Sequence, residues 1–329
     1  EHKTRIIMND LKSISRKLIS YDLDVRQPSD GIIEVSGSLS FEGVYDIETE
    51  ILFDSLNDCI KIFNKIKAVK KPEYGYRGAL FVEYGKNSDV KSVESDYPFG
   101  IERGLPSLEH FRKYPKDNWM TSNKKYENIN NPFSGLRYAE IKYEDSNVAL
   151  FNSGNQGFFM EGNKVKCSLY LYDPWDENNW EREVQVNYGF STGKYEEISS
   201  LKKAIDFNNP LKVFKSKCRK AEDVKCFTPY DFDGEMILTA LYRDENSHAA
   251  HLWNPNNEDV CFTVRLPENI KKVFKSNLLN ENRSELEISG AKVRVKAGKN
   301  EIISLIFLYE KEMVKNIDSY RNVWSDSRN

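Results

Sequence analysis

The feature that most constrains this chain is a repeated alternation of apolar and polar residues over short segments, with turn residues between them. Residues 235–264 show it most clearly, since Met236–Tyr242 alternates between two faces and the polar run Arg243–Ser247 follows. The alternation then resumes, and the turn cluster Asn254–Asn257 separates it from Val260–Val264. A period of two is typical of half-buried β-strands, so this stretch is predicted to form an antiparallel meander.

The same pattern recurs along most of the chain. Further strand candidates are Ile32–Val35, Ser38–Phe41, Val44–Phe53, Cys59–Ile66, Ala79–Tyr84, Tyr138–Tyr143, Val148–Phe151, Val165–Tyr172 and Glu183–Phe190. Residues 85–135 are poor in apolar periodicity and are predicted to form a long excursion from a sheet. Strand after strand without an intervening amphipathic helix favours β-sandwiches, so the predicted fold class is mainly all-β.

Two segments have helical spacing instead. Ile198, Leu201 and Ile205 are spaced for one helical face, and Asn208-Asn209-Pro210 supplies a stop signal. In the tail from Lys311, four apolar residues follow one another at steps of four, three and four: Met313, Ile317, Tyr320 and Trp324. This spacing predicts a short C-terminal helix that packs on its own domain or, alternatively, on a partner.

The length of 329 residues exceeds that of a typical single domain. Pro229 and Gly234 bracket an acidic turn, and a new set of strands follows it. We therefore predict a first β domain over residues 1–230, a smaller β-sandwich over 231–310 and a helical tail over 311–329.

Charge and cysteine content limit the partners and the compartment. The 48 Lys and Arg residues nearly cancel the 51 Asp and Glu residues, for a net charge of -3, so electrostatics favours neither nucleic acid nor an anionic membrane surface. The chain holds five scattered cysteines: Cys59, Cys167, Cys218, Cys226 and Cys261. A disulfide between Cys218 and Cys226 stays open, but free thiols in a reducing compartment are favoured.

We accordingly expect a soluble, cytoplasmic protein, because no apolar run approaches the roughly 20 residues that span a bilayer. The chain begins at Glu1 without a methionine or a signal-type segment. This start suggests a processed or excised piece of a longer protein.

Motifs for common catalytic chemistry are missing from the sequence. His248 and His251 are three residues apart, but no Cys or carboxylate stands at a ligand spacing on a helix, so a scaffold role is favoured over a zinc site. The chain has no Gly-x-Ser-x-Gly, Walker or Gly-x-Gly-x-x-Gly motif. A retaining glycosidase needs only two carboxylates about 5 Å apart, and sequence alone cannot identify such a pair among 51 acidic residues. No catalytic residue and no metal ligand is predicted in this chain.

One segment combines carboxylates with two indoles, Asp173–Trp180. Indole faces stack on sugar rings, which makes Trp175 and Trp180 candidates for carbohydrate binding. The alternative is a loop between strands whose tryptophans cover a sheet edge, since large aromatic side chains mostly supply buried area.

Seven segments matter here for the order in which they follow one another: Glu48–Lys67, Ala79–Tyr84, Tyr97–Arg103, Ala149–Asn152, Gly162–Leu171, Asn208–Leu211 and Glu235–Trp253. Their order resembles that in the C-terminal β region of glycoside hydrolase family 38 α-mannosidases. They follow one another in the family's order and cover roughly residues 40–310. The chain departs from the family at Tyr172-Asp173, where an arginine is usual, and at Gly104–Pro106, which replaces a Pro-Thr-His run.

This resemblance implies a galactose-mutarotase-like β-supersandwich followed by a smaller terminal β-sandwich. In that family the retaining mechanism, with an aspartate nucleophile and a zinc ion held by aspartates and histidines, belongs to an N-terminal α/β domain and an adjoining helical bundle. The motifs of those parts match no stretch of this chain. The resemblance therefore implies no cofactor here and a zinc ion in the absent catalytic domain.

The resulting hypothesis is a C-terminal fragment or subunit of an α-mannosidase-like glycoside hydrolase, inactive alone, which supports the catalytic α/β domain and forms one wall of the mannoside pocket. Glu102 and Arg103 are the candidate sugar contacts, because a planar guanidinium donates paired hydrogen bonds. For Arg103 the alternative is a structural ion pair within a loop.

Two other classes of function stay open. The first is a stand-alone carbohydrate-binding β-sandwich protein that uses Trp175 and Trp180 as a platform for mannosides or other carbohydrate. The second is an interaction scaffold that uses the amphipathic tail. The sequence does not fix the oligomeric state, and a homo-oligomer stays open.

Overall fold

The computed structural model describes residues 3–8, 18–41, 45–55, 58–69, 78–104, 132–171, 183–194, 196, 198–210, 230–233, 236–244 and 247–309. The chain divides into two compact units, residues 1–211 and 212–329, and each is treated by itself. The predicted domain limits, at residues 230 and 310, stay a prediction. The predicted tail helix over 311–329 and the segment with Trp175 and Trp180 lie outside the described residues.

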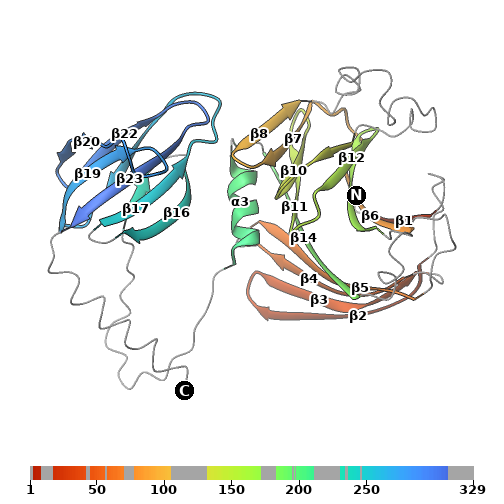
Figure 1. Ribbon diagram of the computed structural model, residues 1–329. Helices are drawn as coiled ribbons and strands as arrows, with labels where there is room; N and C mark the ends of the chain where they lie inside the picture. The colour runs from red at the N-terminus through yellow and green to blue at the C-terminus, as the bar shows by residue number, and fades with distance from the viewer. Residues whose placement is uncertain are drawn as a thin grey trace, which may run out of the picture. The chain divides into compact units, whose positions relative to one another are not determined.

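The first unit is built from a nine-stranded and a five-stranded sheet (Figure 1). The larger sheet has the order β2-β3-β4-β5-β14-β11-β10-β7-β8. Its strands are β2 (Leu18–Ser29), β3 (Ile32–Phe41), β4 (Tyr45–Asp54), β5 (Cys59–Ala68), β7 (Ser92–Tyr97), β8 (Gly100–Gly104), β10 (Tyr138–Lys142), β11 (Asn147–Asn152) and β14 (Glu183–Gly193). The smaller sheet, in the order β1-β6-β13-β12-β9, holds β1 (Lys3–Met8), β6 (Gly78–Gly85), β9 (Pro132–Ser134), β12 (Gly157–Glu161) and β13 (Lys164–Leu171).

Alternation explains how these two sheets enclose one core. Along β4, Tyr45 and Ile47 are buried while Asp46 and Glu48 are exposed, as a strand with one face in a core requires. On the facing sheet, alternate residues of β6 such as Val82 enter the same apolar cluster. We call the face of the nine-stranded sheet toward this core its inner face and the opposite face its outer face.

The first unit also has one described helix, α3 (Ser199–Asn208), which confirms the helix predicted around Ile198–Ile205. Its N-cap residue, Ile198, has a left-handed backbone with φ 55° and offers no side-chain cap. At its other end the Asn208 and Asn209 side chains donate to carbonyls of the last turn, and Pro210 follows. The ring of Phe207 lies 6.3 Å from that of Phe151 on β11, so α3 packs on the outer face of the nine-stranded sheet.

The second unit is a smaller sandwich of a four-stranded and a five-stranded sheet (Figure 1). The four-stranded sheet, in the order β15-β18-β22-β21, holds β15 (Asp231–Asp233), β18 (Val260–Arg265), β21 (Ile288–Ser289) and β22 (Lys292–Ala297). The other, in the order β16-β17-β23-β19-β20, holds β16 (Ile237–Asp244), β17 (Ser247–Trp253), β19 (Ile270–Ser276), β20 (Ser284–Leu286) and β23 (Ile302–Tyr309). A second apolar cluster that includes Leu252, Phe262 and Leu305 lies between them.

The mainly all-β fold class is thus confirmed, with two corrections to local predictions. The meander over residues 235–264 is wrong in its third strand, because β16 pairs with β17 while β18 joins the other sheet of the second unit. The buried Asn254 makes this change of layer: its side chain donates to the carbonyls of Glu258 and Gly298, each at 2.8 Å. The excursion predicted over residues 85–135 is wrong for β7, β8 and β9, which are strands of the sheets.

Two further expectations concern thiols and membranes. Of the five cysteines, Cys59, Cys167 and Cys261 are free thiols, and Cys218 and Cys226 lie outside the described residues. Within the described ranges, no helix has the length and apolar character that crossing a lipid bilayer requires.

The second core yields a test with matched substitutions. Leu305 is fully buried in this cluster, whereas Leu279 is 75% exposed. Leu305→Ala should lower the free energy of unfolding by about 2–5 kcal/mol, because it leaves a cavity. Leu279→Ala should change it by less than about 0.5 kcal/mol. Urea unfolding followed by circular dichroism measures both, and equal losses in the two variants would contradict the described core.

Candidate functional site

A cluster of buried charged side chains lies on the outer face of the nine-stranded sheet, where β8, β7 and β10 run side by side. Glu94 and Asp96 are two residues apart on β7 and therefore point to the same face. Their neighbours Val93 and Ser95 point to the inner face, so the strand alternates acid with core residue. Glu94 is 1% exposed and Asp96 is fully buried, and burial of charge to this degree requires partners.

Glu94 receives three hydrogen bonds from three different side chains. Its Oε2 accepts from Arg103 Nε at 2.9 Å and from Lys142 Nζ at 2.7 Å, and its Oε1 accepts from Tyr138 Oη at 2.7 Å. Burial by itself would raise the pKa of Glu94, but the hydrogen bonds from Lys142 and Tyr138 and the charges of Lys142 and Arg103 outweigh it, so the pKa lies below its ordinary value of 4.5. Glu94 is therefore held as a charged carboxylate.

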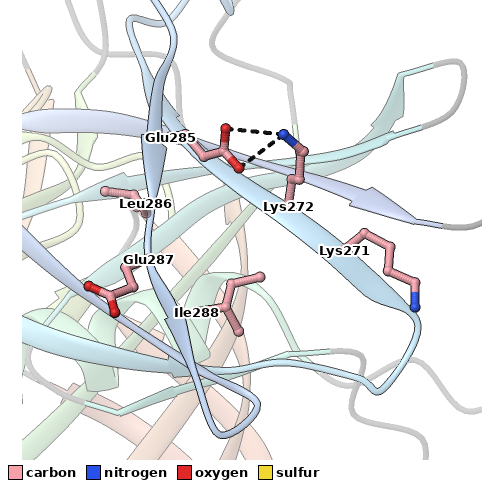
Figure 2. A pocket seen from close by; sticks show the side chains of 6 residues that line it. All are labelled: Lys271, Lys272, Glu285, Leu286, Glu287 and Ile288. Carbon is pink, nitrogen blue, oxygen red and sulfur yellow. Dashed lines mark hydrogen bonds and ion pairs between the residues drawn. The ribbon is translucent and has the colours of Figure 1, made fainter.

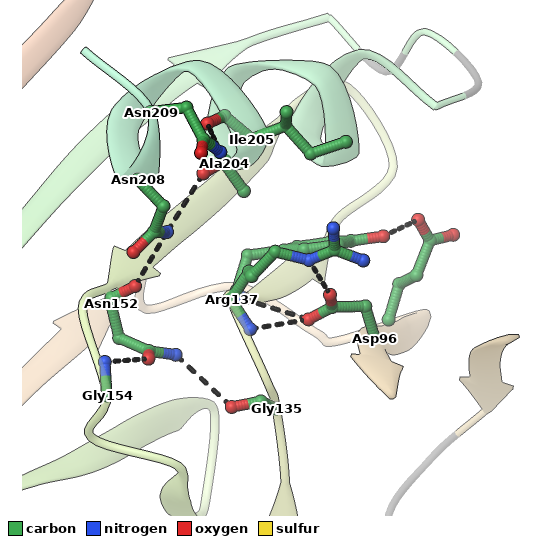
Figure 3. A network of polar contacts seen from close by, with 11 residues as sticks. Asp96, Gly135, Arg137, Asn152, Gly154, Ala204, Ile205, Asn208 and Asn209 are labelled. Carbon is green, nitrogen blue, oxygen red and sulfur yellow. Dashed lines mark hydrogen bonds and ion pairs between the residues drawn. The ribbon is translucent and has the colours of Figure 1, made fainter. Parts of the chain in front are cut away.

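Asp96 organises the chain that leads into β10 (Figure 3). Its Oδ2 accepts from Arg137 Nε at 2.6 Å, while its Oδ1 accepts from the backbone N–H groups of Arg137 at 2.8 Å and Tyr138 at 3.1 Å. One buried carboxylate thus neutralises a guanidinium and satisfies two backbone donors at once.

A third buried carboxylate, Glu140, is the cross-strand partner of Glu94, which places their Cβ atoms about 5 Å apart. Its Oε1 accepts hydrogen bonds from the Asn147 side chain and, at 3.0 Å, from Ser200 Oγ of α3. Burial raises the pKa of Glu140 and the charge of Glu94 adds to the effect, against the lowering by the Asn147 and Ser200 hydrogen bonds. Two neighbouring carboxyls thus have pKa values displaced in opposite directions.

Displaced pKa values are typical of acid and base pairs in active sites, but they also occur in structural ion networks. Here Ser200 of the helix α3 is bonded to Glu140, and Glu94 is enclosed by its three donors. Both carboxyls are at least nine-tenths buried, and the two cavities described below are lined by other residues. The arrangement therefore fixes strands β7, β8 and β10 to one another and α3 to the sheet.

The end of α3 is fixed in a similar way by amide side chains (Figure 3). Asn208 Nδ2 donates to the Asn152 carbonyl at 3.0 Å, and Asn152 Nδ2 donates to the Gly135 carbonyl at 3.2 Å. Asn152 Oδ1 accepts from the Gly154 N–H at 3.1 Å. Asn152 and Asn208 belong to two of the segments that carry the family resemblance, and the structure brings them together in a structural role.

The sequence-predicted site residues fall into two groups. Arg103 lies in β8 and forms the ion pair with Glu94, and Glu102 is exposed. As successive strand residues they leave β8 on opposite faces, at the end of the nine-stranded sheet. Trp175 and Trp180 lie outside the described residues. Whether any of the four contacts sugar stays a prediction.

Sequence analysis missed Glu94, Asp96, Glu140 and Lys142. A signal was present, because acidic residues alternate with smaller ones in Ser92–Tyr97 and because Tyr138, Glu140 and Lys142 share one face of a predicted strand. Nothing in either segment by itself indicates that the two charged faces become neighbours, since 42 or more residues separate the hydrogen-bonded partners on β7 and β10.

Two shallow depressions are present in the described part of the molecule. One, of about 390 Å³, lies over β3, β4, β5 and the start of β14 and is lined by Ser38, Leu39, Ser40, Asp46, Ile47, Glu48, Lys65, Lys67 and Glu183. Lys65 bridges Glu48 at 3.5 Å and Glu183 at 3.1 Å there. The other, of about 370 Å³, lies in the second unit, and Figure 2 shows Lys272 beside Glu285 there. Their ion-pair distance is 3.1 Å.

His248 and His251 both lie in β17. His248 Nδ1 is 2.7 Å from Tyr230 Oη, and His251 Nε2 is 3.1 Å from Tyr242 Oη. Three residues apart in a strand, they point to opposite faces. Among the residues that the structure describes, no group of three or more His, Cys, Asp or Glu side chains is placed to hold a metal ion.

Comparison with known proteins adds information at the level of the fold. No protein-family model and no curated protein matches the sequence. An α-mannosidase from Enterococcus faecalis V583 has a similar structure, with a TM-score of 0.67 and 12% identity over 93% of this chain. A glycosyl hydrolase family 38 protein from Enterococcus faecalis gives 0.64 and 13% over 94%. This chain has the fold of part of a family 38 α-mannosidase.

The predicted resemblance to the C-terminal β region of family 38 is thereby confirmed for the fold. The chain spans only 38% and 40% of the length of the two family 38 structures that it matches. The galactose-mutarotase-like assignment of the first unit stays a prediction.

The pKa of Glu94 is lowered and that of Glu140 is raised, so replacement of each by Gln should change the free energy of unfolding in different directions. Glu94→Gln should lower the free energy of unfolding at pH 7 by about 1.5–3 kcal/mol, since hydrogen bonds to a charged acceptor are lost. Glu94 stabilises the fold above its unfolded-state pKa, and that contribution disappears as pH falls through its lowered folded-state pKa. The Glu94→Gln deficit should therefore shrink in acid.

Glu140→Gln is the matched control, because Gln keeps an acceptor for Asn147 and Ser200. The raised pKa means that folding costs free energy as pH rises from 4.5 through the folded-state value, so Glu140→Gln should be neutral or stabilising at pH 7. Urea unfolding of both variants between about pH 2.5 and pH 8 measures this, because the loss of the Glu94 contribution lies below pH 4.5. Equal destabilisation of the two variants at pH 7 would refute the assignment.

Proposed function

We propose that this chain is the C-terminal β part of an α-mannosidase-like glycoside hydrolase and that it supports a catalytic domain without performing the chemistry itself. The observation that carries the proposal is an asymmetry of coverage. The similarity takes in 93–94% of this chain but only 38–40% of the matched α-mannosidase and family 38 chains. A chain that corresponds to one part of an enzyme is expected to serve as that part.

The chemistry of the described residues supports the same proposal. A retaining glycosidase requires a nucleophile and an acid/base carboxyl that both reach the sugar. Glu94 and Glu140 are neighbours but are buried and bonded to structural partners. The zinc ion and the aspartate nucleophile that the resemblance implies are accordingly assigned to a catalytic α/β domain, the proposed partner.

Contacts with a mannoside form a further part of the proposal. Arg103 is the better placed of the two described candidates, because its side chain is 30% exposed while Glu94 holds its Nε and thereby its orientation. Glu102 would contact a ligand on the other side of β8. Trp175 and Trp180 would supply stacking surfaces.

A second candidate is a stand-alone carbohydrate-binding protein. The depression over β3, β4 and β5 favours it, because hydroxyl, carboxylate and ammonium groups there could bond to the donors and acceptors of a neutral sugar. It reaches Glu183, three residues after Trp180 in the sequence.

Hydrolysis of p-nitrophenyl α-mannoside tests the proposal. The purified chain should give no zinc-dependent turnover, whereas the native protein isolated from its source cells with any catalytic part should hydrolyse the substrate. Turnover by this chain alone would refute the supporting role. A native protein without the activity, together with saturable mannoside binding that a Trp175→Ala, Trp180→Ala double variant abolishes, would favour the second candidate instead.

A further inference from the structure

The inner face of the nine-stranded sheet stays apolar beyond the region that the core covers. Four large hydrophobic side chains on β2, β3 and β4 are 39–64% exposed: Leu23, Val25, Ile33 and Phe53. We call these four residues the β2–β4 apolar patch. Large apolar side chains that gather on one exposed face mark a contact surface, whereas scattered ones do not.

Strand register shows that the patch is contiguous with the core. Ile33 is paired with Phe53, and Phe53 is paired with Ile60, which packs against the core of the first unit. One step along, Val25 is paired with Val35, and Val35 with Ile51, another residue that packs on that core. The patch therefore continues the inner face of the nine-stranded sheet beyond the part that the core of the first unit covers.

The opposite face of the same strands is polar. It carries Asp22, Asp24, Arg26, Glu34, Ser36 and Glu50, with Ile32 and Leu52 as apolar exceptions, and Arg26 Nε is bonded to Asp24 Oδ2 at 2.7 Å. A mainly polar face opposite an apolar one is typical of strands with one face in water and one face covered. The sequence of β2 to β4 thus specifies a covered face where the described residues leave an exposed one.

The apolar side chains of the patch favour an apolar protein surface as the binding partner. Its four side chains carry no charge and no hydrogen-bonding group, so they cannot bond to the hydroxyl groups of a sugar, to a metal ion or to a phosphate. Addition of a strand at the edge of β2 is disfavoured near the tip, because Pro28 has no N–H and the pairing with β3 shifts between Arg26 and Ser29. Packing of side chains against side chains is the mode that remains.

We propose that the β2–β4 apolar patch is the surface on which the rest of an α-mannosidase-like enzyme packs, through apolar side chains of its own. This inference rests on the proposed function. Most of the length of the matched family 38 chains has no counterpart in this chain, so a polypeptide of that kind is the expected cover. A second copy of this chain is the competing occupant.

Photo-cross-linking in the native protein identifies the occupant. A diazirine-bearing amino acid in place of Val25 or Ile33 should join a peptide of the catalytic part, whether that part lies on the same polypeptide or on another, and mass spectrometry reads the peptide pair. The same amino acid in place of Asp24, on the polar face, is the control and should not form that link. Links from Val25 and Ile33 only to a second copy of this chain, or to no catalytic peptide, would overturn the inference.

A matched pair of charge insertions gives an independent readout. Val25→Lys puts an ammonium group into the apolar contact, whereas Ser36→Lys puts one between its cross-strand neighbours Asp24 and Glu50 on the polar face. In the native enzyme, Val25→Lys should shorten the thermal half-life of p-nitrophenyl α-mannosidase activity at least tenfold, and Ser36→Lys should leave it within twofold. Val25 is already 64% exposed, so its replacement should leave the fold of this chain intact by circular dichroism.

The two proposals fail in different ways. A native protein without α-mannosidase activity refutes the proposed function and with it this inference. Activity that is present, with equal half-lives for Val25→Lys and Ser36→Lys and with no catalytic peptide linked to the patch, refutes the inference alone.

Discussion

Where a sheet is covered on both faces, every buried polar group needs a hydrogen-bonding or ionic partner. Under α3, buried carboxylates are paired with cationic and hydrogen-bonding side chains. Glu94, Asp96 and Glu140 are all at most 1% exposed, and each is bonded to groups from other strands or from the helix. Since an unpaired buried carboxylate is far more costly than a paired one, these groups specify which strands are neighbours as well as how firmly they are held. The strand order β8-β7-β10 and the position of α3 on the sheet both depend on these three carboxylates.

Much of the fold follows from the sequence, because alternation is a local signal. The strands β3, β4, β5 and β6 match predicted segments, since each sends apolar residues to one face. Helix α3 was predictable because its apolar residues have a period near four and Pro210 ends it. The hairpin of β7 and β8 was not, because the residues that β7 buries on its outer face are acids, which a hydrophobic pattern counts as exposed.

Local alternation does not tell which of two facing sheets a strand joins. The pattern of β18 is the same whether it pairs with β17 or crosses to the facing sheet, and the buried amide of Asn254 decides between them only through carbonyls 4 and 44 residues away. The candidate site has the same limit. The ion pair that was one of two alternatives for Arg103 is present, but its partner Glu94 is identified by strand register, which no single segment contains.

The bond between Asn208 and the Asn152 carbonyl has a consequence for how α3 ends. The last turn of a helix opens more easily than its middle, because its carbonyls have no partner further along the helix. Here the last residue of α3 is also bonded to β11, so the last turn can open fully only if a bond to the sheet breaks with it. Local opening at the end of α3 is therefore coupled to the stability of the nine-stranded sheet.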